Sequence, residues 1–162
     1  MTTQQWIKKL GGHAGELYVA AELSKRGIPN ALLPENFSDD DIIVGSKDAS
    51  RICFIQVKSC HPDRSKSFIL RKENENWIDS PDNYFVAFVW LGSPHKNEAP
   101  RYWIATKREV GQACMTHPAH SAPKPNWERR FFPSHPKFPS LNPEWENNWS
   151  VFDPYLPKAI SE

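Results

Sequence analysis

The sequence has no long apolar run, and none of its runs approaches the roughly 20 residues that a membrane-spanning helix needs. Its beginning contains Gln4, Gln5, Lys8 and Lys9, and the apolar core of a secretory signal does not follow them. These two absences exclude an evident membrane anchor or export signal. We therefore expect a cytoplasmic protein with no membrane partner.

Cysteine and net charge are also scarce. The three cysteines, Cys53, Cys60 and Cys114, are too few and odd in number for a disulfide framework, which fits a reducing compartment. Twenty Lys and Arg against 19 Asp and Glu leave a formal charge of +1, so no overall field attracts a polyanion. The 162 residues suffice for one domain that folds without disulfides or a structural metal.

The order of helix-forming and β-branched segments predicts an α/β domain with a central mixed sheet of about five strands. Good helix formers predict a helix over residues 3–27, continuous or interrupted at Gly11-Gly12, which Gly27 and Pro29 end. Turn residues at 45–50 predict that two of the strands form a hairpin. The predicted strands are residues 31–33, 41–44, 51–57, 84–91 and 101–106, and a second helix is predicted over Lys107–Thr116.

The composition changes near residue 118. Nine of the 15 prolines lie between Pro118 and Pro157, and no glycine follows Gly111. The same stretch contains too many aromatic residues for a disordered linker. We predict a domain over residues 1–117 and an irregular arm, residues 118–162, that packs its rings on that domain.

Polar residues end a strand that is otherwise apolar. In the segment RICFIQVK, alternation places Cys53, Ile55 and Val57 on one face of the strand. Gln56 and Lys58 fall on the other face, at its end. A polar pair there is costly unless a partner satisfies it.

Acidic residues can supply that partner. If the hairpin turns at residues 47–49, Asp41 lies across from Gln56, directly or one diagonal away. Glu16, Val19 and Leu23 share a helical stripe that should face the sheet. Two carboxylates about 4 Å apart repel each other by about 4 kcal/mol at an effective dielectric of 20, which favours a bound divalent cation. Carboxylates with an amide oxygen suit Mg²⁺ or Mn²⁺ better than zinc.

These residues resemble the PD-(D/E)XK nuclease superfamily, a restriction-endonuclease-like fold, and are most similar to archaeal Holliday-junction resolvases. The resemblance rests on Gly12-x-x-Gly15-Glu16, Asp41-Ile42-Ile43-Val44 and Gln56-Val57-Lys58-Ser59, and it covers about residues 12–60. Asp40 stands where the family has proline. Gln56 stands where the family usually has an acid. A glutamine at this position resembles the methyl-directed type IV restriction enzymes.

The resemblance implies a divalent-metal-dependent endonuclease that hydrolyses phosphodiester bonds in DNA. Its metal, Mg²⁺ or Mn²⁺, would be held by Asp41, Gln56, the Val57 carbonyl and Glu16, and Lys58 would position or activate water. The implied catalytic residues are Glu16, Asp41, Gln56 and Lys58. Members usually act as homodimers, which we expect here too.

Residues near this site are candidates for contacts with the DNA backbone, although a plain surface loop and a helix-terminal histidine are the alternatives. These candidates are His13, Ser59, His61, Arg64 and Lys66. Cys114-x-x-His117-x-x-His120 also invites a zinc interpretation, but its spacing matches none of the common zinc patterns.

Each part of the site also has an ordinary interpretation. The run from Asp39 to Asp41 can be a solvated turn, Glu16 can be an exposed helix residue paired with a lysine, and Gln56 with Lys58 can protect an edge strand. The corresponding functional alternatives are a weak or inactive nuclease-fold module that binds nucleic acid or a protein partner, and a protein-interaction role of the aromatic arm.

Overall fold

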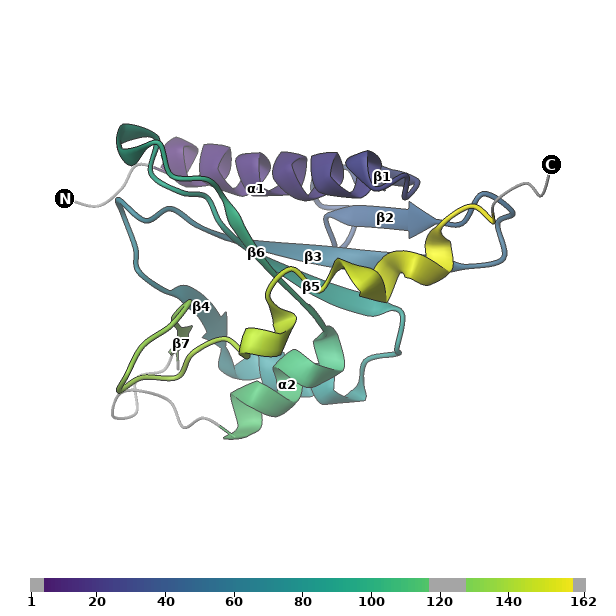
Figure 1. Cartoon of the computed structure of the whole chain (residues 1–162). Coiled ribbons are helices and arrows are strands. Elements are labelled where there is room, and N and C mark those ends of the chain that lie inside the picture. Colours follow the sequence, from purple (N-terminus) through teal and green to yellow (C-terminus); the bar gives the residue numbers. More distant parts are fainter. Residues whose placement is uncertain (1–4, 117–127, 159–162) are drawn as a thin grey trace.

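A five-stranded mixed sheet forms the centre of the molecule, in the order β1-β2-β3-β5-β6. The computed structural model describes residues 5–116 and 128–158. β3 pairs with β5 in parallel, and the other neighbours in this sheet are antiparallel. This is the predicted mixed α/β architecture (Figure 1). The strands are β1 (Asn30–Leu32), β2 (Ile42–Gly45), β3 (Ile52–Cys60), β5 (Tyr84–Trp90) and β6 (Arg101–Thr106).

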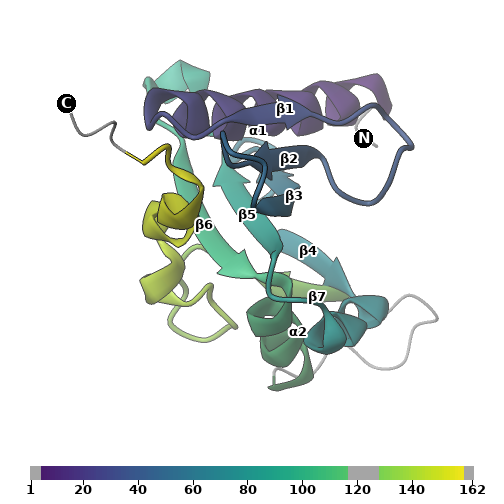
Figure 2. The same cartoon turned by 90° about the vertical axis from the view of Figure 1, so that its right-hand side faces the viewer.

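The first helix, α1 (Gln5–Lys25), runs along one face of the sheet without interruption at its glycines (Figures 1 and 2). Its buried positions are Gly15, Val19 and Leu23, one turn apart. The stripe predicted to face the sheet began at Glu16, which is one residue too late. Gly15 faces the sheet, and Glu16 lies half-buried beside it.

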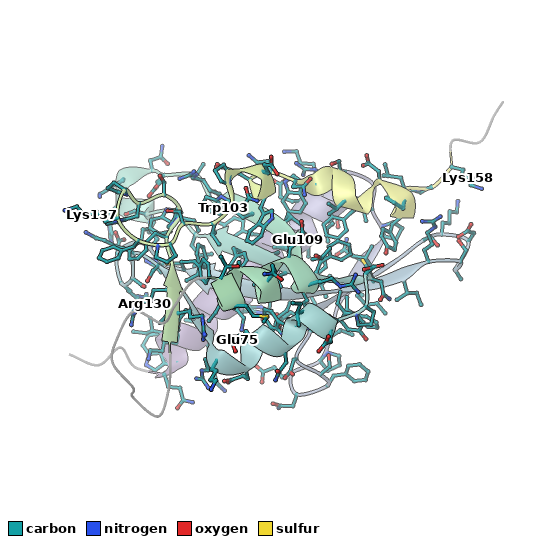
Figure 3. The ribbon with its side chains drawn as sticks, turned by 90° about the horizontal axis from the view of Figure 1, so that it is seen from below. Glu75, Trp103, Glu109, Arg130, Lys137 and Lys158 are labelled. Carbon is teal, nitrogen blue, oxygen red and sulfur yellow. The ribbon has the colours of Figure 1, made fainter. Side chains whose placement is uncertain are left out.

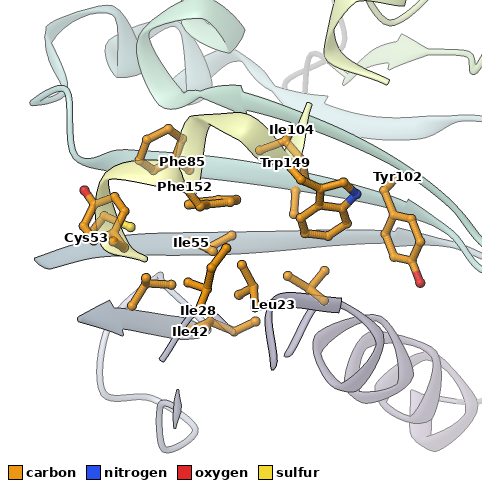
Figure 4. Close-up of a cluster of buried hydrophobic side chains, with 14 of the residues drawn as sticks. Leu23, Ile28, Ile42, Cys53, Ile55, Phe85, Tyr102, Ile104, Trp149 and Phe152 are labelled. Atoms are coloured by element: carbon orange, nitrogen blue, oxygen red, sulfur yellow. The ribbon is translucent and has the colours of Figure 1, made fainter. Parts of the chain in front are cut away.

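The C-terminal arm completes the core on the same face as α1. Its last helical segment, η4 (Trp149–Tyr155), buries Trp149, Phe152 and Tyr155. They pack with side chains of α1, β2, β3, β5 and β6 in one cluster (Figure 4). The aromatic residues of the arm thus cover this face of the sheet together with α1.

The opposite face of the sheet has its own core. It is covered by α2 (Lys107–Thr116), by the 3-10 helix η1 (Lys72–Asp79) and by a small sheet of β4 (Phe68–Arg71) and β7 (Glu128–Phe131). Seen from below, α2 and η1 lie side by side (Figure 3). Gly111 permits this contact, since a Cβ there would meet the Ile78 nitrogen at 2.5 Å. Arg129 of β7 binds Glu75 of η1.

The predicted strands and the second helix agree with these elements to within a few residues, but β4, β7 and η1 were not predicted. β3 extends past the predicted end to Cys60, and it lies between β2 and β5. Although β3 is a central strand, its pairing with β2 ends at Ile55, so Gln56 and Lys58 lie on a part of β3 that is paired with β5 alone. Among the described residues, no helix has the length and apolarity needed to cross a membrane, and the three cysteines are free and buried.

Candidate active site

Asp41 is held at the point where β2 and β3 begin to separate. The hairpin register pairs Ile42 with Ile55, so Asp41 comes opposite Gln56, as the turn at residues 47–49 predicted. The Asp41 N–H donates to the Ile55 carbonyl at 2.9 Å, and its Oδ2 accepts from the Val57 N–H at 2.6 Å. The carboxylate is thus fixed against the strand edge. Burial raises the pKa of Asp41, while the Val57 N–H and the Lys58 ammonium oppose that rise.

Gln56 and Val57 present two further oxygen atoms near Asp41. Gln56 Oε1 is buried and has no hydrogen-bond partner within the described parts of the chain. A buried acceptor without a donor is unfavourable by roughly 1–3 kcal/mol, so it is suited to an electropositive ligand. The Val57 carbonyl points to the same edge as its N–H, because both groups of one residue face one neighbour in an extended strand.

Lys58 lies one residue further along β3, half-buried on the same face as Gln56. Burial lowers the pKa of its ammonium, and the Asp41 carboxylate opposes this by favouring the charged form. Since Asp41 lies opposite Gln56 in the hairpin register, strand alternation puts Lys58 on the same face of the sheet as Asp41, two residues beyond Gln56. The ammonium and the carboxylate thus lie toward the same end of the β2–β3 hairpin.

Glu16 reaches this region because α1 comes very close to β3. A Cβ at Gly15 would meet the Ser59 hydroxyl at 1.8 Å, so only glycine allows this approach. The side chain of Glu16 is 28% exposed, and the His13 Nδ1 lies 3.7 Å from its carboxylate. Burial raises the pKa of Glu16, and the Asp41 carboxylate raises it further. Glu16 is therefore neither directed into bulk solvent nor paired with a lysine.

This donor set fits a hard divalent cation held with help from its substrate. In the described parts of the chain, no three His, Cys, Asp or Glu side chains gather around one point. Two carboxylates with an amide and a backbone carbonyl nevertheless match Mg²⁺, which is commonly held by one or two carboxylates and substrate phosphates. Burial raises the pKa of both Asp41 and Glu16, so a divalent cation at this place would favour their charged forms.

The sequence did not reveal a buried ion pair next to the site. Lys107, the first residue of α2, donates to Asp40 Oδ1 at 2.7 Å, and the two side chains are only 7% and 9% exposed. The ammonium also lies over the rings of Trp77 and Tyr84, at 5.3 and 5.4 Å. Asp40 directly precedes Asp41, so this ion pair anchors the segment that carries the central carboxylate.

The candidate DNA contacts lie in different surroundings. His13 is exposed beside Glu16, and Lys66 is exposed in the loop after β3. Ser59, His61 and Arg64 line a pocket described below, although the Ser59 hydroxyl itself is buried against α1.

For the zinc interpretation, burial raises the pKa of the Cys114 thiol to about 11. His117 and His120 lie outside the described residues. The solvated-turn interpretation does not describe Asp40 and Asp41, since both take part in buried or half-buried hydrogen bonds.

The fold is similar to that of a bacterial homing endonuclease, I-Ssp6803I. The two structures superpose with a TM-score of 0.54 at 11% sequence identity, over 90% of this chain and 92% of that chain. At this identity the likeness shows the fold alone, which resembles that of a restriction endonuclease. No protein-family model and no curated protein matches the sequence.

Proposed function

We propose that the protein is a divalent-metal-dependent nuclease that hydrolyses phosphodiester bonds in DNA. The main support is that the hairpin register and strand alternation bring Asp41, Gln56 and Lys58 to one face at one end of the β2–β3 hairpin, with the Gln56 oxygen buried and lacking a hydrogen-bond donor among the described residues. The endonuclease-like fold adds support. Asp41, Gln56, the Val57 carbonyl and Glu16 would hold Mg²⁺ or Mn²⁺.

The role of each protein group at the site follows from its charge. The chemistry that a divalent ion supplies at such a site is activation of water and neutralisation of phosphoryl charge. The Val57 N–H orients the Asp41 carboxylate before substrate arrives, which lowers the reorganisation needed during reaction. Lys58 supplies a positive charge toward the phosphate, in a half-buried position where that charge is weakly screened. Glu16 supplies the second negative charge.

Cleavage assays on purified protein test the proposal. Supercoiled plasmid, linear duplex, single strands and four-way junctions are incubated with Mg²⁺, Mn²⁺ or EDTA. We expect metal-dependent cleavage that is lost in Asp41→Asn and Lys58→Met. The control variants Asp153→Asn and Lys47→Met remove the same charges from exposed positions in the arm and the hairpin turn, and they should retain activity.

A second candidate function follows from Gln56, which carries no negative charge where an acid is usual. A site with fewer charges binds metal more weakly, so the chain would then act as a nucleic-acid-binding module of the same fold. DNA binding without cleavage at any tested Mg²⁺ or Mn²⁺ concentration would favour this function. Cleavage that persists in Asp41→Asn would refute the proposed site.

A further inference from the structure

A pocket adjoins the candidate active site and shares Lys58 with it. This pocket has a volume of about 350 Å³ and lies between the first half of α1, the end of β3 and the loop that follows β3. Lys8 contributes from α1, Lys58 from β3 and Arg64 from the loop. His61 adds an imidazole, and the described lining residues include no Asp or Glu. Three cations from three separate segments thus surround one space whose described lining contains no carboxylate.

The loop that carries Arg64 is held in place before any ligand binds. The backbone N–H groups of Arg64 and Ser65 both donate to the His61 carbonyl at 2.9 Å. The Arg64 guanidinium donates to the Ile7 carbonyl at 3.4 Å, which ties the loop to α1. The Cys60 thiol donates to the Ser65 carbonyl at 3.4 Å. The cationic side of the pocket is therefore built by tertiary contacts.

Gly12 keeps one wall of the pocket open. A glycine inside a helix is less favourable than alanine, yet a Cβ at Gly12 would find no described atom within 4 Å. Packing within the described protein thus gives no reason for glycine at this position. Any side chain there would extend into the pocket, because Gly12 is one of its lining residues.

We propose that this pocket binds one nucleotide unit of the DNA strand, next to the phosphate that Lys58 contacts. Its own phosphate would face Lys8 and Arg64, and its sugar would face the apolar side chains of Phe68 and Leu91. Contacts of this kind position a strand without reading its sequence. The proposal deepens the proposed function, since it names how the substrate of that site is held.

Binding measured without cleavage tests the pocket separately from catalysis. The anisotropy of a fluorescein-labelled DNA duplex is followed in EDTA from about 50 to about 200 mM salt. Lys8→Gln/Arg64→Gln removes two pocket charges, and Lys9→Gln/Lys25→Gln removes two exposed charges of α1 as the matched control. We expect the pocket variant to lose about tenfold in affinity or more, and the slope of log K against log salt to fall by about 1.

Gly12→Leu separates pocket occupancy from charge and from folding. Leucine is a better helix former than glycine, so the melting temperature should rise while DNA affinity falls. Ala21→Leu, at an exposed position of the same helix, should leave affinity unchanged. Equal losses in the two charge-removal variants, wild-type affinity in Gly12→Leu, or no DNA binding by the wild type would overturn the pocket. Wild-type protein that binds through this pocket but never cleaves would overturn the proposed function alone.

Discussion

The buried pair of Asp40 and Lys107 provides a quantitative test of how the site is held. Replacing Lys107 with methionine leaves the Asp40 carboxylate in a nearly solvent-free position, because the two side chains are 9% and 7% exposed. Removing one partner of a buried ion pair is destabilising by about 3–5 kcal/mol. Loss of the contacts with Trp77 and Tyr84 adds to this effect, by up to about 2 kcal/mol for a desolvated cation over a ring.

This loss is large beside the total stability of an ordinary domain, about 5–15 kcal/mol. We expect Lys107→Met to lower the free energy of unfolding by at least about 3 kcal/mol and the melting temperature by about 6–20 °C. Asp40→Leu/Lys107→Met should recover most of the stability, because replacing a whole buried pair with apolar side chains is often neutral. Urea unfolding followed by tryptophan fluorescence measures both variants.

The same double variant reports on function. Asp40 directly precedes Asp41, and its ion pair with Lys107 holds that segment in place. The Asp40 carboxylate raises the pKa of Asp41 and the Lys107 ammonium lowers it, so removing both charges leaves no net loss of the charged form. Because the segment loses its anchor, a protein that regains its stability without this pair should still show weaker Mg²⁺ binding than the wild type. A loss below about 1 kcal/mol in Lys107→Met, or additive effects of the two substitutions, would refute the view that the pair is tightly coupled.

Three further predictions concern the neighbouring residues. Gly15→Ala should lower the free energy of unfolding by about 1–3 kcal/mol. Gly15→Ala/Ser59→Ala should recover only part of this loss, because the Ser59 Cβ would still lie 3.1 Å from the new methyl group. Urea unfolding measures both variants, and wild-type stability of Gly15→Ala would contradict the prediction. Folding raises the pKa of Asp41 above its ordinary value of 3.8 and that of Glu16 above 4.5, so the folded state binds more protons than the unfolded state. The stability of the metal-free protein should therefore fall as the pH rises from the ordinary pKa values through the raised pKa values. Asp41→Asn should therefore raise the metal-free melting temperature at pH 7 and abolish its increase with Mg²⁺, and an unchanged response to Mg²⁺ would contradict the assignment. Gln56→Glu places a carboxylate where the Gln56 amide oxygen lacks a hydrogen-bond donor among the described residues. Calorimetry should then show tighter Mg²⁺ binding and a lower stability of the metal-free protein. Unchanged Mg²⁺ binding would mean that the metal binds elsewhere.

Local sequence patterns were sufficient for the centre of the molecule. Strict alternation in β3 identified its two faces, and the short turn between β2 and β3 fixed their register, so the position of Asp41 opposite Gln56 could be predicted. The α1 stripe was displaced because Gly15 has no apolar side chain to count, although its close approach to Ser59 makes it the residue that faces the sheet.

Long-range partners could not be read from the sequence. The acidic run before β2 indicates a need for a cation, yet Lys107 lies 67 residues away, and nothing near it in the sequence distinguishes it from other lysines. β7 contains Arg129 and Arg130 and follows a proline-rich stretch, so it lacks the alternation of an ordinary strand. Its pairing with β4 arises from tertiary contacts, including the bond from Arg129 to the Cys114 carbonyl at 2.7 Å.

The most direct test of the central claim is the anomalous scattering of crystals soaked in Mn²⁺. The account predicts a manganese peak within bonding distance of an Asp41 oxygen, Gln56 Oε1 and the Val57 carbonyl, with Glu16 bound directly or through water. The peak should disappear in Asp41→Asn crystals soaked in the same way. Manganese bound only at other positions, in protein that cleaves DNA with Mn²⁺, would contradict the assignment.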